Sequence, residues 1–486
     1  MLAHARRQLR ISRLPTALIK MPPPSPAKRR ASNASVSPPP IKRKAQAAIS
    51  KGAVASFFTP ASQKPKDCTA WSERAPNATS NSDAAATLLV ARYIPEGTPD
   101  DESRSKRRKI AAFDLDSTLI ATSSGKKHAT GPGDWKWWDR SVPSRLQSLY
   151  NDDGYRVVIL SNQGGLTLHP DPKSKGPTKS AKARVDQFKQ KCSSVLAQLG
   201  IPTTLYAATA SDVFRKPRVG MWTEMLQDYG LDPADVDLEH SIFVGDAGGR
   251  TAQLVKGSKP LLKDFSCSDR NLAHNVGISY QTPEEYFLGQ EPRDFTRDFD
   301  LAHHCFPDAD ESGKNAEGRL FERKNDTDIV LFCGPPGAGK STFYWKHLKS
   351  LGYERVNQDQ LKTKEKCLAA ATDLVKEGRS VAVDNTNPDP ETRAQWVALA
   401  AKRAVPIRCI WFKTPITLAQ HNDAVRSMNP MLNPEARASL PVLAFNSFGS
   451  RFKEPKLSEG FQDIIEIDFS FRGSREEYAI WAKYWL

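Results

Sequence analysis

A hydrophobic run from Ile329 to Cys333 leads directly into the segment Gly334-Pro-Pro-Gly-Ala-Gly-Lys-Ser-Thr342. The segment fits the pattern GxxxxGK[ST], with a predicted buried strand before it and a predicted amphipathic helix, Phe343 to Leu351, after it. Glycines at these positions let backbone N–H groups wrap phosphate oxygens, and the helix N-terminus favours their negative charge. The predicted ATP-binding residues are Gly334, Gly337, Gly339, Lys340, Ser341 and Thr342.

A second hydrophobic run, Ile110 to Phe113, ends in two carboxylates, Asp114 and Asp116. Such a run predicts a buried parallel strand, and ligands bind at the carboxyl ends of parallel strands. Two neighbouring carboxylates repel each other unless a cation lies between them, and Mg²⁺ prefers carboxylate oxygens. A surface Asp pair in a loop is the alternative, which a buried strand leading into the pair disfavours.

Three later segments continue this pattern: a strand that ends in Ser161 and Asn162, the tripeptide Arg-Lys216-Pro, and a strand that ends in Asp246. With Asp114-Leu-Asp-Ser-Thr118 they resemble the four motifs of the haloacid-dehalogenase phosphatase superfamily. The resemblance implies that one Asp attacks phosphorus and the other serves as general acid and base. A second acid often follows the Asp246 position closely in that superfamily, but Gly248, Gly249 and Arg250 stand here. The implied phosphatase residues are Asp114, Asp116, Ser161 and Lys216 as catalytic groups, Asp114, the Asp116 carbonyl and Asp246 as Mg²⁺ ligands, and Asn162 and Arg250 as substrate contacts.

The second half carries two further polar clusters after apolar runs, Asn357-Gln-Asp359 and Asp384-Asn-Thr-Asn387. With the phosphate loop they resemble the kinase half of polynucleotide kinases. The resemblance implies Asp359 as the general base, Arg426 as a lid arginine, Ser341 as a Mg²⁺ ligand, and Asp384 and Asn385 as substrate contacts. Ala424 and Gln358 depart from basic residues that are common in relatives, and Arg393, Arg403 and Arg437 are either solvated charges or DNA contacts.

Narrower features join the two halves into one family resemblance. These are an aromatic and basic string, Trp135 to Asp139, the string Phe214 to Trp222, and the string Lys263 to Arg270. Together they resemble the polynucleotide kinase 3′-phosphatase family, whose implied substrates are DNA ends and whose implied cofactors are Mg²⁺ and ATP. Core packing is the alternative interpretation of each tryptophan. A metabolite phosphatase fused to a small-molecule kinase, and an inactive repair scaffold, remain alternative functions.

The first 66 residues hold 14 Lys and Arg residues and no acid, so 14 of the 15 net positive charges lie there. Low apolar content predicts a disordered tail. Two basic clusters, Lys28 to Arg30 and Lys42 to Lys44, resemble a nuclear import signal, while the residues before Met21 have the composition of a mitochondrial presequence. Val54, Phe57 and Phe58 resemble a peptide that docks on the sliding clamp. The tail is too short for the forkhead-associated domain of animal relatives, so the resemblance is to a fungal type.

The predicted architecture is α/β, with two doubly wound parallel-sheet domains after the tail. The longest apolar runs fall far short of the ~18 residues that a membrane span needs. Seven scattered Cys without a CxxC pair predict a reducing compartment and no structural zinc. We expect a monomer. The predicted segments are a tail at 1–85, a phosphatase domain resembling the haloacid-dehalogenase type at 86–295, a linker at 296–320 and a P-loop 5′-kinase domain at 321–486.

Overall fold

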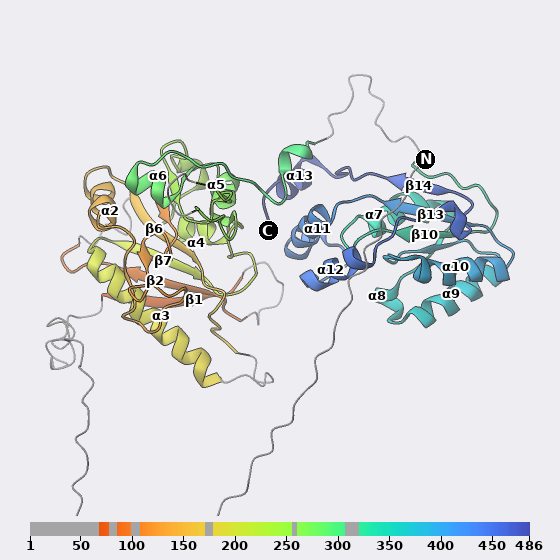
Figure 1. The fold of residues 1–486 in the computed structure, drawn as a ribbon, viewed down its shortest axis with the longest axis horizontal. Coiled ribbons are helices and arrows are strands. Elements are labelled where there is room, and N and C mark those ends of the chain that lie inside the picture. Colours follow the sequence, from red (N-terminus) through yellow and green to blue (C-terminus); the bar gives the residue numbers. More distant parts are fainter. Residues whose placement is uncertain (1–67, 77–84, 99–106, 171–177, 255–259, 307–319) are drawn as a thin grey trace, which may run out of the picture. The chain divides into compact units, whose positions relative to one another are not determined.

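The computed structural model describes residues 68–76, 85–98, 107–170, 178–254, 260–306 and 320–486. The predicted targeting signals and the peptide around Val54, Phe57 and Phe58 lie outside these residues. The described residues form two large sheets with flanking helices, together with one two-stranded sheet (Figure 1). None of its helices combines the length and apolar character that crossing a bilayer requires.

The first sheet has seven strands in the order β1-β2-β7-β6-β3-β8-β9. Strands β7, β6, β3, β8 and β9 are parallel, while β1 and β2 are antiparallel to their neighbours at one edge. The strands are β1 Thr69–Arg74, β2 Leu88–Tyr93, β3 Ile110–Phe113, β6 Arg156–Asn162, β7 Thr203–Ala208, β8 Ile242–Val244 and β9 Ser279–Gln281, with a small separate pair of β4 Ile120–Ala121 and β5 Lys136–Trp137.

Alternate residues of the central strands face opposite helical layers. Phe113 and Ile159 belong to a core with α2 and α3, whereas Ala112 and Val158 belong to a second core with α4 and α5. Because both faces are covered, these strands are almost continuously hydrophobic, as the sequence pattern predicted. The helices are α2 Val142–Asn151, α3 Thr178–Leu199, α4 Gly220–Asp228, α5 Ser268–Val276 and α6 Pro283–Leu288.

Strand β1 corrects the predicted extent of the disordered tail. Thr69–Arg74 was placed in the tail, yet it pairs with β2 along its whole length. Trp71 packs against the core of the α2 and α3 layer, and this contact stabilises an edge strand of otherwise polar residues. The sequence did not predict this strand, because Thr69–Arg74 has only one large apolar residue on its inner face.

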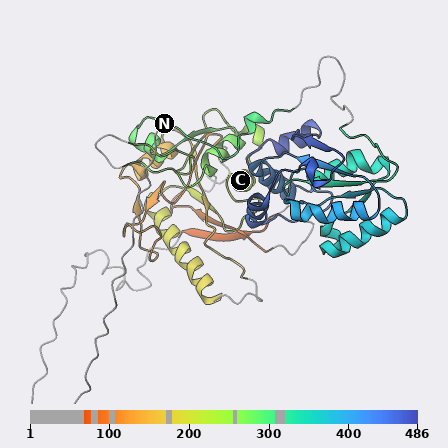
Figure 2. The ribbon, with the colours of Figure 1, turned by 45° about the vertical axis from the view of Figure 1, so that its right-hand side comes forward.

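The second sheet is wholly parallel, in the order β11-β12-β10-β13-β14. Helices α9 and α10 cover one face through Trp396 and Ala371, and the phosphate-loop helix covers the other through Phe343 and Leu348 (Figures 1 and 2). The strands are β10 Ile329–Cys333, β11 Glu354–Val356, β12 Val381–Val383, β13 Ile407–Phe412 and β14 Ile464–Ile467. The helices are α7 Lys340–Phe343, α8 Gln358–Leu361, α9 Lys364–Lys376, α10 Pro390–Lys402, α11 Ile416–Met428, α12 Val442–Arg451 and α13 Arg475–Trp481.

The predicted class, α/β with parallel sheets, is therefore confirmed. Two local features differ from the expectation. The predicted helix after the phosphate loop is α7 followed by a wider π-helical turn, Tyr344–Leu348, and a 3₁₀ turn, Lys349–Leu351. Part of the predicted linker is also ordered, because Phe299 and Leu301 pack against Trp481 of α13.

Candidate active sites

Three predicted phosphatase residues lie at the carboxyl edge of the first sheet. Asp114 follows β3, Ser161 lies near the end of β6, and Asp246 follows β8. The Asp114 backbone N–H donates to the carbonyl of Val244 at 2.9 Å, which ties the ends of β3 and β8 together. The parallel register therefore brings together motifs that are far apart in the sequence, as predicted.

Lys216 joins this edge from the turn before α4. Its Nζ lies 2.7 Å from Asp114 Oδ1 and 2.8 Å from Asp269 Oδ1, and its side chain is buried. Burial alone would lower the pKa of Lys216, but the two carboxylates raise it, so the ammonium stays charged. Burial raises the pKa of Asp114, and Lys216 opposes that effect.

Asp269 is a site residue that sequence reasoning missed. It lies in the first turn of α5 and accepts a hydrogen bond from the Ala247 N–H at 3.1 Å. Gly245 makes this approach feasible, because a Cβ there would lie 2.2 Å from Asp269 Oδ2. The residue stands in the string Lys263 to Arg270, which was noted only as a family resemblance. It supplies the second acid that was unassigned after Asp246.

The carboxylates of Asp114, Asp246 and Asp269 fit a Mg²⁺ ion. One oxygen from each lies within 4.8 Å of the other two. Burial raises the pKa of Asp246, and the negative charges of Asp114 and Asp269 raise it further. Among the residues that the structure describes, Lys216 is the one cation paired with Asp114 and Asp269, so the group keeps net negative charge that a hard divalent cation would offset.

Asp116 lies at the exposed side of this group. Its Oδ2 accepts from Gln163 Nε2 at 2.7 Å, and its Oδ1 lies 3.0 Å from Lys191 Nζ of α3. Gln163 also donates to Ser161 Oγ at 2.9 Å, which links the two predicted catalytic residues. Neither Gln163 nor Lys191 was predicted, although Gln163 directly follows the Ser161-Asn162 motif.

Two predicted substrate contacts have structural partners instead. The Asn162 amide is engaged by Lys216, accepting from its N–H at 2.9 Å and donating to its carbonyl at 3.1 Å. Arg250 is buried and pairs with Asp264 at 2.9 Å and Glu284 at 2.6 Å. The prediction of Arg250 as a substrate contact is therefore wrong: its guanidinium braces a loop. Asn162 instead positions Lys216.

The aromatic string is also structural. Trp135, Trp137 and Trp138 are partly buried and pack against the core beneath α2 and α3. Trp222 is buried in the other core. These contacts favour the core-packing interpretation over an aromatic rim around the phosphatase pocket.

In the second domain, the phosphate loop follows β10 and leads into α7. Gly337 has a positive φ of 77°, and a Cβ there would lie 2.2 Å from the carbonyl oxygen of Ala419. A glycine is therefore required at this turn. Lys340 is buried and its Nζ donates to the carbonyls of Gly334 and Pro335 at 3.1 and 2.6 Å. Burial lowers the pKa of Lys340 to about 8.

Ser341 lies in a network of charged side chains. Its Oγ donates to Asp384 Oδ2 at 2.8 Å and accepts from Arg355 Nη2 at 2.9 Å. Arg355 also pairs with Asp384 at 2.6 Å and with Glu435 at 2.9 Å. Asp384 therefore contacts the phosphate loop instead of presenting itself to an acceptor, and Arg355 is a further residue that sequence reasoning missed.

Asp359, the predicted base, is held at the start of α8. Its N–H donates to Asn357 Oδ1 at 2.8 Å, and its side chain is 74% exposed. The Asn385 side chain supports this turn, because its Oδ1 accepts from the Gln358 N–H at 2.9 Å. Asp359 is thus open to an incoming hydroxyl.

Arg426, the predicted lid arginine, and Arg437, predicted as a solvated charge or a DNA contact, differ in their contacts. Arg437 pairs with Glu435 at 2.5 Å, and it also has Nη2 at 3.1 Å from Ser341 Oγ and Nη1 at 3.6 Å from Asp359 Oδ2, so it spans the phosphate loop and the predicted base. Arg426 pairs instead with Asp423 of its own helix. Both line a pocket of about 1170 Å³ that also includes Lys340 and Asp359.

Arg393, one of the arginines expected to be a surface charge or a DNA contact, is neither. It is completely buried and pairs with Glu459 at 2.8 Å. Its Nη1 also donates to the Asn387 and Pro388 carbonyls at 3.2 and 3.1 Å. Arg393 therefore stabilises the loop after β12.

These two sites define a two-domain phosphoryl-transfer enzyme, with an aspartate-based phosphatase centre before a P-loop kinase. Residues 109–287 match the family described as polynucleotide kinase 3 phosphatase, and residues 329–455 match a family described as an AAA domain. A bifunctional polynucleotide phosphatase/kinase of Schizosaccharomyces pombe is 38% identical over 366 residues, covering 75% of this chain and 80% of that protein. The chain belongs to the family of bifunctional polynucleotide phosphatase/kinases.

Two other relatives match different shares of the chain. A protein of Acanthamoeba polyphaga mimivirus is 31% identical over 388 residues, covering 77% of this chain and 88% of the viral protein. The polynucleotide 3′-phosphatase ZDP of Arabidopsis thaliana is 31% identical over 191 residues, covering 39% of this chain and 25% of the plant protein.

Proposed function

We propose that this chain heals DNA ends by removing 3′-phosphates and by phosphorylating 5′-hydroxyls with ATP. The products are the 3′-hydroxyl and 5′-phosphate that ligation requires. The observation that carries the proposal is the presence, in one chain, of the Asp114-Lys216-Asp269 centre and of a phosphate-loop pocket with the exposed carboxylate of Asp359.

In the phosphatase reaction, Asp114 is the nucleophile that forms a bond to phosphorus. The bond from phosphorus to the 3′-oxygen breaks, and Asp116 gives that oxygen its proton. Asp116 then accepts a proton from the water that hydrolyses the aspartyl phosphate. Lys216 keeps Asp114 ionised and balances charge on the phosphoryl oxygens.

The carboxylates of Asp114, Asp246 and Asp269 would hold Mg²⁺. When bound, the ion supplies positive charge that offsets the phosphoryl oxygens and the repulsion among the three acids. Asn162 fixes the Lys216 backbone, so the ammonium stays aligned with Asp114 and Asp269.

In the kinase reaction, Asp359 accepts the proton of the 5′-hydroxyl, whose oxygen attacks the γ-phosphorus of ATP. The bond from this phosphorus to the bridging oxygen of ADP breaks. Lys340 binds the phosphates, and Ser341 is placed by Asp384 to hold the Mg²⁺ that accompanies the nucleotide. Arg437 lies between Ser341 and Asp359, where charge develops during transfer.

The test uses a nicked duplex with a 3′-phosphate and a 5′-hydroxyl, incubated with Mg²⁺ and labelled ATP. We expect the wild-type chain to heal both ends, Asp114→Asn to lose only the phosphatase, and Lys340→Ala to lose only the kinase. Unchanged DNA ends alongside rapid hydrolysis of small phosphomonoesters support the metabolite alternative. Unchanged ends and no hydrolysis of any phosphomonoester support the scaffold alternative.

The sequence of the tail supports a nuclear location, a mitochondrial form that includes the residues before Met21, and clamp binding through Val54, Phe57 and Phe58. Reporter fusions that begin at Met1 and at Met21 test the two locations. An exclusively nuclear signal from both fusions contradicts the mitochondrial part, and clamp binding that survives Phe57→Ala with Phe58→Ala contradicts the peptide.

A further inference from the structure

Helix α3 carries cationic side chains on both flanks of its buried face. With 3.6 residues per turn, Arg184 and Lys191 lie on one flank, while Lys182 and Lys189 lie on the other. The face between the flanks packs into the core. Its buried residues are Ala181, Val185, Phe188, Cys192, Val195, Leu196 and Leu199.

Contacts show where each flank leads. On the first flank, Lys191 Nζ lies 3.0 Å from Asp116 Oδ1, so this flank ends at the phosphatase site. On the second flank, Lys189 lies 4.0 Å from Glu73 and 5.7 Å from the ring centroid of Trp71. The second flank therefore leads to strand β1.

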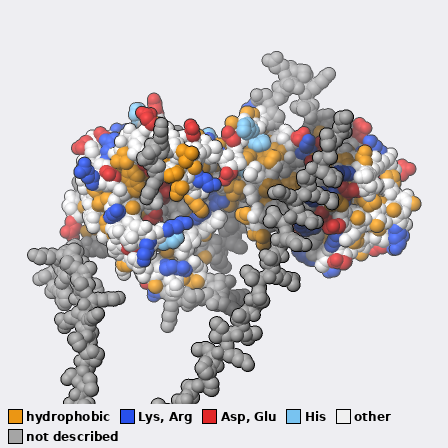
Figure 3. Space-filling model, viewed as in Figure 1, with side chains coloured by type: hydrophobic (Ala, Val, Ile, Leu, Met, Phe, Trp, Pro, Cys, Tyr) orange, Lys and Arg blue, Asp and Glu red, His pale blue; other side chains and the backbone are white. Residues whose placement is uncertain are grey.

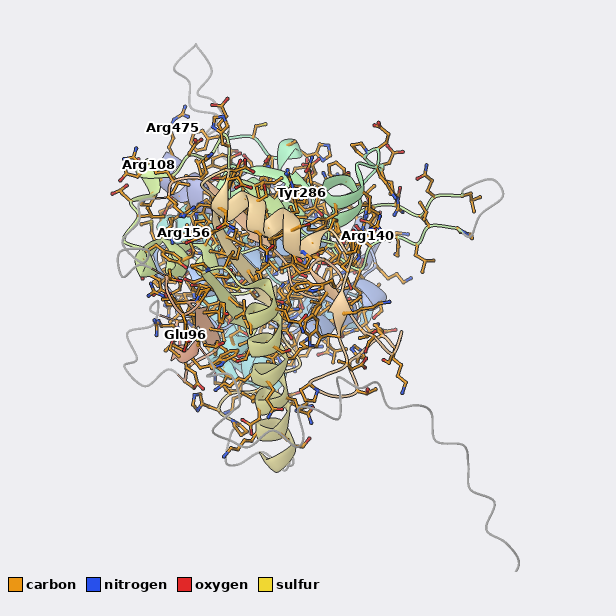
Figure 4. All side chains as sticks on the ribbon, turned by 90° about the vertical axis from the view of Figure 1, so that its left-hand side faces the viewer. Glu96, Arg108, Arg140, Arg156, Tyr286 and Arg475 are labelled. Atoms are coloured by element: carbon orange, nitrogen blue, oxygen red, sulfur yellow. The ribbon has the colours of Figure 1, made fainter. Side chains whose placement is uncertain are left out.

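Arg184 continues the first flank away from the site. The yellow helix α3 extends beyond the rest of its domain (Figures 1 and 4), and both Arg184 and Lys182 are exposed. Within the described parts of the chain, no carboxylate pairs with either side chain. Elsewhere on the face seen in Figure 3, acidic and basic side chains are intermixed.

We propose that the Arg184–Lys191 flank binds the phosphodiester backbone of the strand whose 3′ end is in the phosphatase site. Seven helical residues span ~10.5 Å. At ~3.4 Å per nucleotide along one strand, this is about three nucleotides. Lys191 therefore lies at the reacting end, and Arg184 meets a phosphate about three nucleotides upstream. The inference rests on the proposed function. It adds the requirement that the substrate strand be long enough to reach Arg184.

A nucleic-acid strand fits this flank better than a protein partner does. The flank is continuous with the catalytic residue Asp116, which a bound 3′ end must approach. Arg184 is exposed and Lys191 is partly buried beside Asp116, with Gln187 and no exposed large apolar residue between them, and this matches a polyanion and not an apolar peptide. An acidic peptide is the remaining competitor, and it is an arm of the test.

The experiment compares full-length wild type, Arg184→Ala and the matched control Lys182→Ala. Substrates are a 3′-phosphorylated dinucleotide and a 3′-phosphorylated octanucleotide, each with a 5′ fluorophore that blocks the kinase acceptor. For Arg184→Ala we expect the octanucleotide KM to rise roughly 3- to 10-fold with kcat unchanged, and dinucleotide kinetics to stay as in wild type. The slope of log K against log salt should fall by about 0.7, as for one lost contact with a single strand.

Four outcomes overturn the proposal. An equal rise in the octanucleotide KM for Arg184→Ala and Lys182→Ala would show that only the net charge of the helix matters. A loss of activity of Arg184→Ala on the dinucleotide would show that the substitution disturbs the active site itself. Competition by an acidic peptide that matches competition by an unlabelled oligonucleotide excludes a strand-specific surface. If wild type hydrolyses neither substrate, the proposed function fails, and anisotropy with the labelled octanucleotide still decides: equal affinity of wild type and Arg184→Ala overturns the flank.

Discussion

The two active sites differ in how they hold charge. In the phosphatase site, the side chains of Asp114 and Lys216 are 12% and 2% exposed, and they pair with each other at a sheet edge. In the kinase site, the predicted base Asp359 is 74% exposed and lies on a short helix. A carboxylate that attacks phosphorus benefits from exclusion of water, whereas a base for a hydroxyl of a long substrate must be reachable.

The two sites also offer different groups to a phosphate. The phosphatase site presents side-chain charge from Lys216 against a cluster of acids. The kinase site uses a backbone loop whose turn at Gly337 is tightly packed, with Lys340 beneath it. Backbone N–H groups of the phosphate loop remain when a side chain of the kinase site is removed, but no backbone group can replace a nucleophile. We therefore expect the most damaging single substitution at Asp114, the predicted nucleophile.

The largest effect is expected for Asp114→Asn. The amide cannot form the bond to phosphorus, so 3′-phosphatase activity should fall roughly 10⁴-fold or more. Steady-state hydrolysis of a 3′-phosphorylated oligonucleotide measures it. Kinase activity of the same preparation is the folding control, and phosphatase activity within tenfold of wild type contradicts the assignment.

Lys340→Ala tests the kinase half of the comparison. Loss of the ammonium should reduce 5′-kinase kcat/KM about 10³-fold, somewhat less than the loss at Asp114, because the backbone N–H groups of the loop remain. Transfer of labelled phosphate from ATP measures this loss. Phosphatase activity should be unchanged, and a kinase as active as wild type would remove Lys340 from the mechanism.

The strand ends and their motifs were predictable because they depend on local sequence. Asp114, Asp246 and the phosphate loop each follow an apolar run that folds as a buried strand. Parallel pairing then places Asp114 and Asp246 at one edge, so a pattern of short-range signals was enough to predict the centre of the phosphatase site.

Apart from Gln163, which directly follows a predicted motif, the residues that sequence reasoning missed reach their sites from distant elements. Asp269 comes from the start of α5, Lys191 from the middle of α3, and Arg355 from β11. The prediction for Arg250 relied on its position beside a motif. Its partners Asp264 and Glu284 are brought to it by tertiary packing, which the local sequence does not show. The local sequence does not distinguish an arginine that is free to bind a phosphate from one that is already paired with carboxylates of the same chain.

Arg437→Ala and Arg426→Ala sharpen the description of the kinase site. Because Arg437 spans Ser341 and Asp359, its loss should lower kinase kcat about 10²-fold. Arg426 pairs with Asp423, which also accepts from the Leu440 N–H at 2.8 Å, so Arg426→Ala should mainly raise KM, by less than tenfold. Initial rates over a grid of ATP and 5′-hydroxyl oligonucleotide concentrations separate the two effects, with phosphatase activity as the folding control. A larger loss of kcat for Arg426→Ala than for Arg437→Ala would assign the stabilisation of charge during transfer to Arg426 and not to Arg437.

The smallest expected effect is a pH dependence of ATP affinity. Because burial lowers the pKa of Lys340 to about 8, its side chain is an ammonium below that pH and neutral above it. Phosphates favour the ammonium, so the Kd for ATP should be constant from about pH 6.5 to 7.5 and weaken by about tenfold by pH 9. Isothermal titration calorimetry measures the profile. Lys340→Arg keeps its charge at every pH in this range, so its profile should be flat even if its affinity is lower. A wild-type profile as flat as that of Lys340→Arg would show that the loop holds this ammonium charged, and the contrast with the strongly paired Lys216 would then disappear.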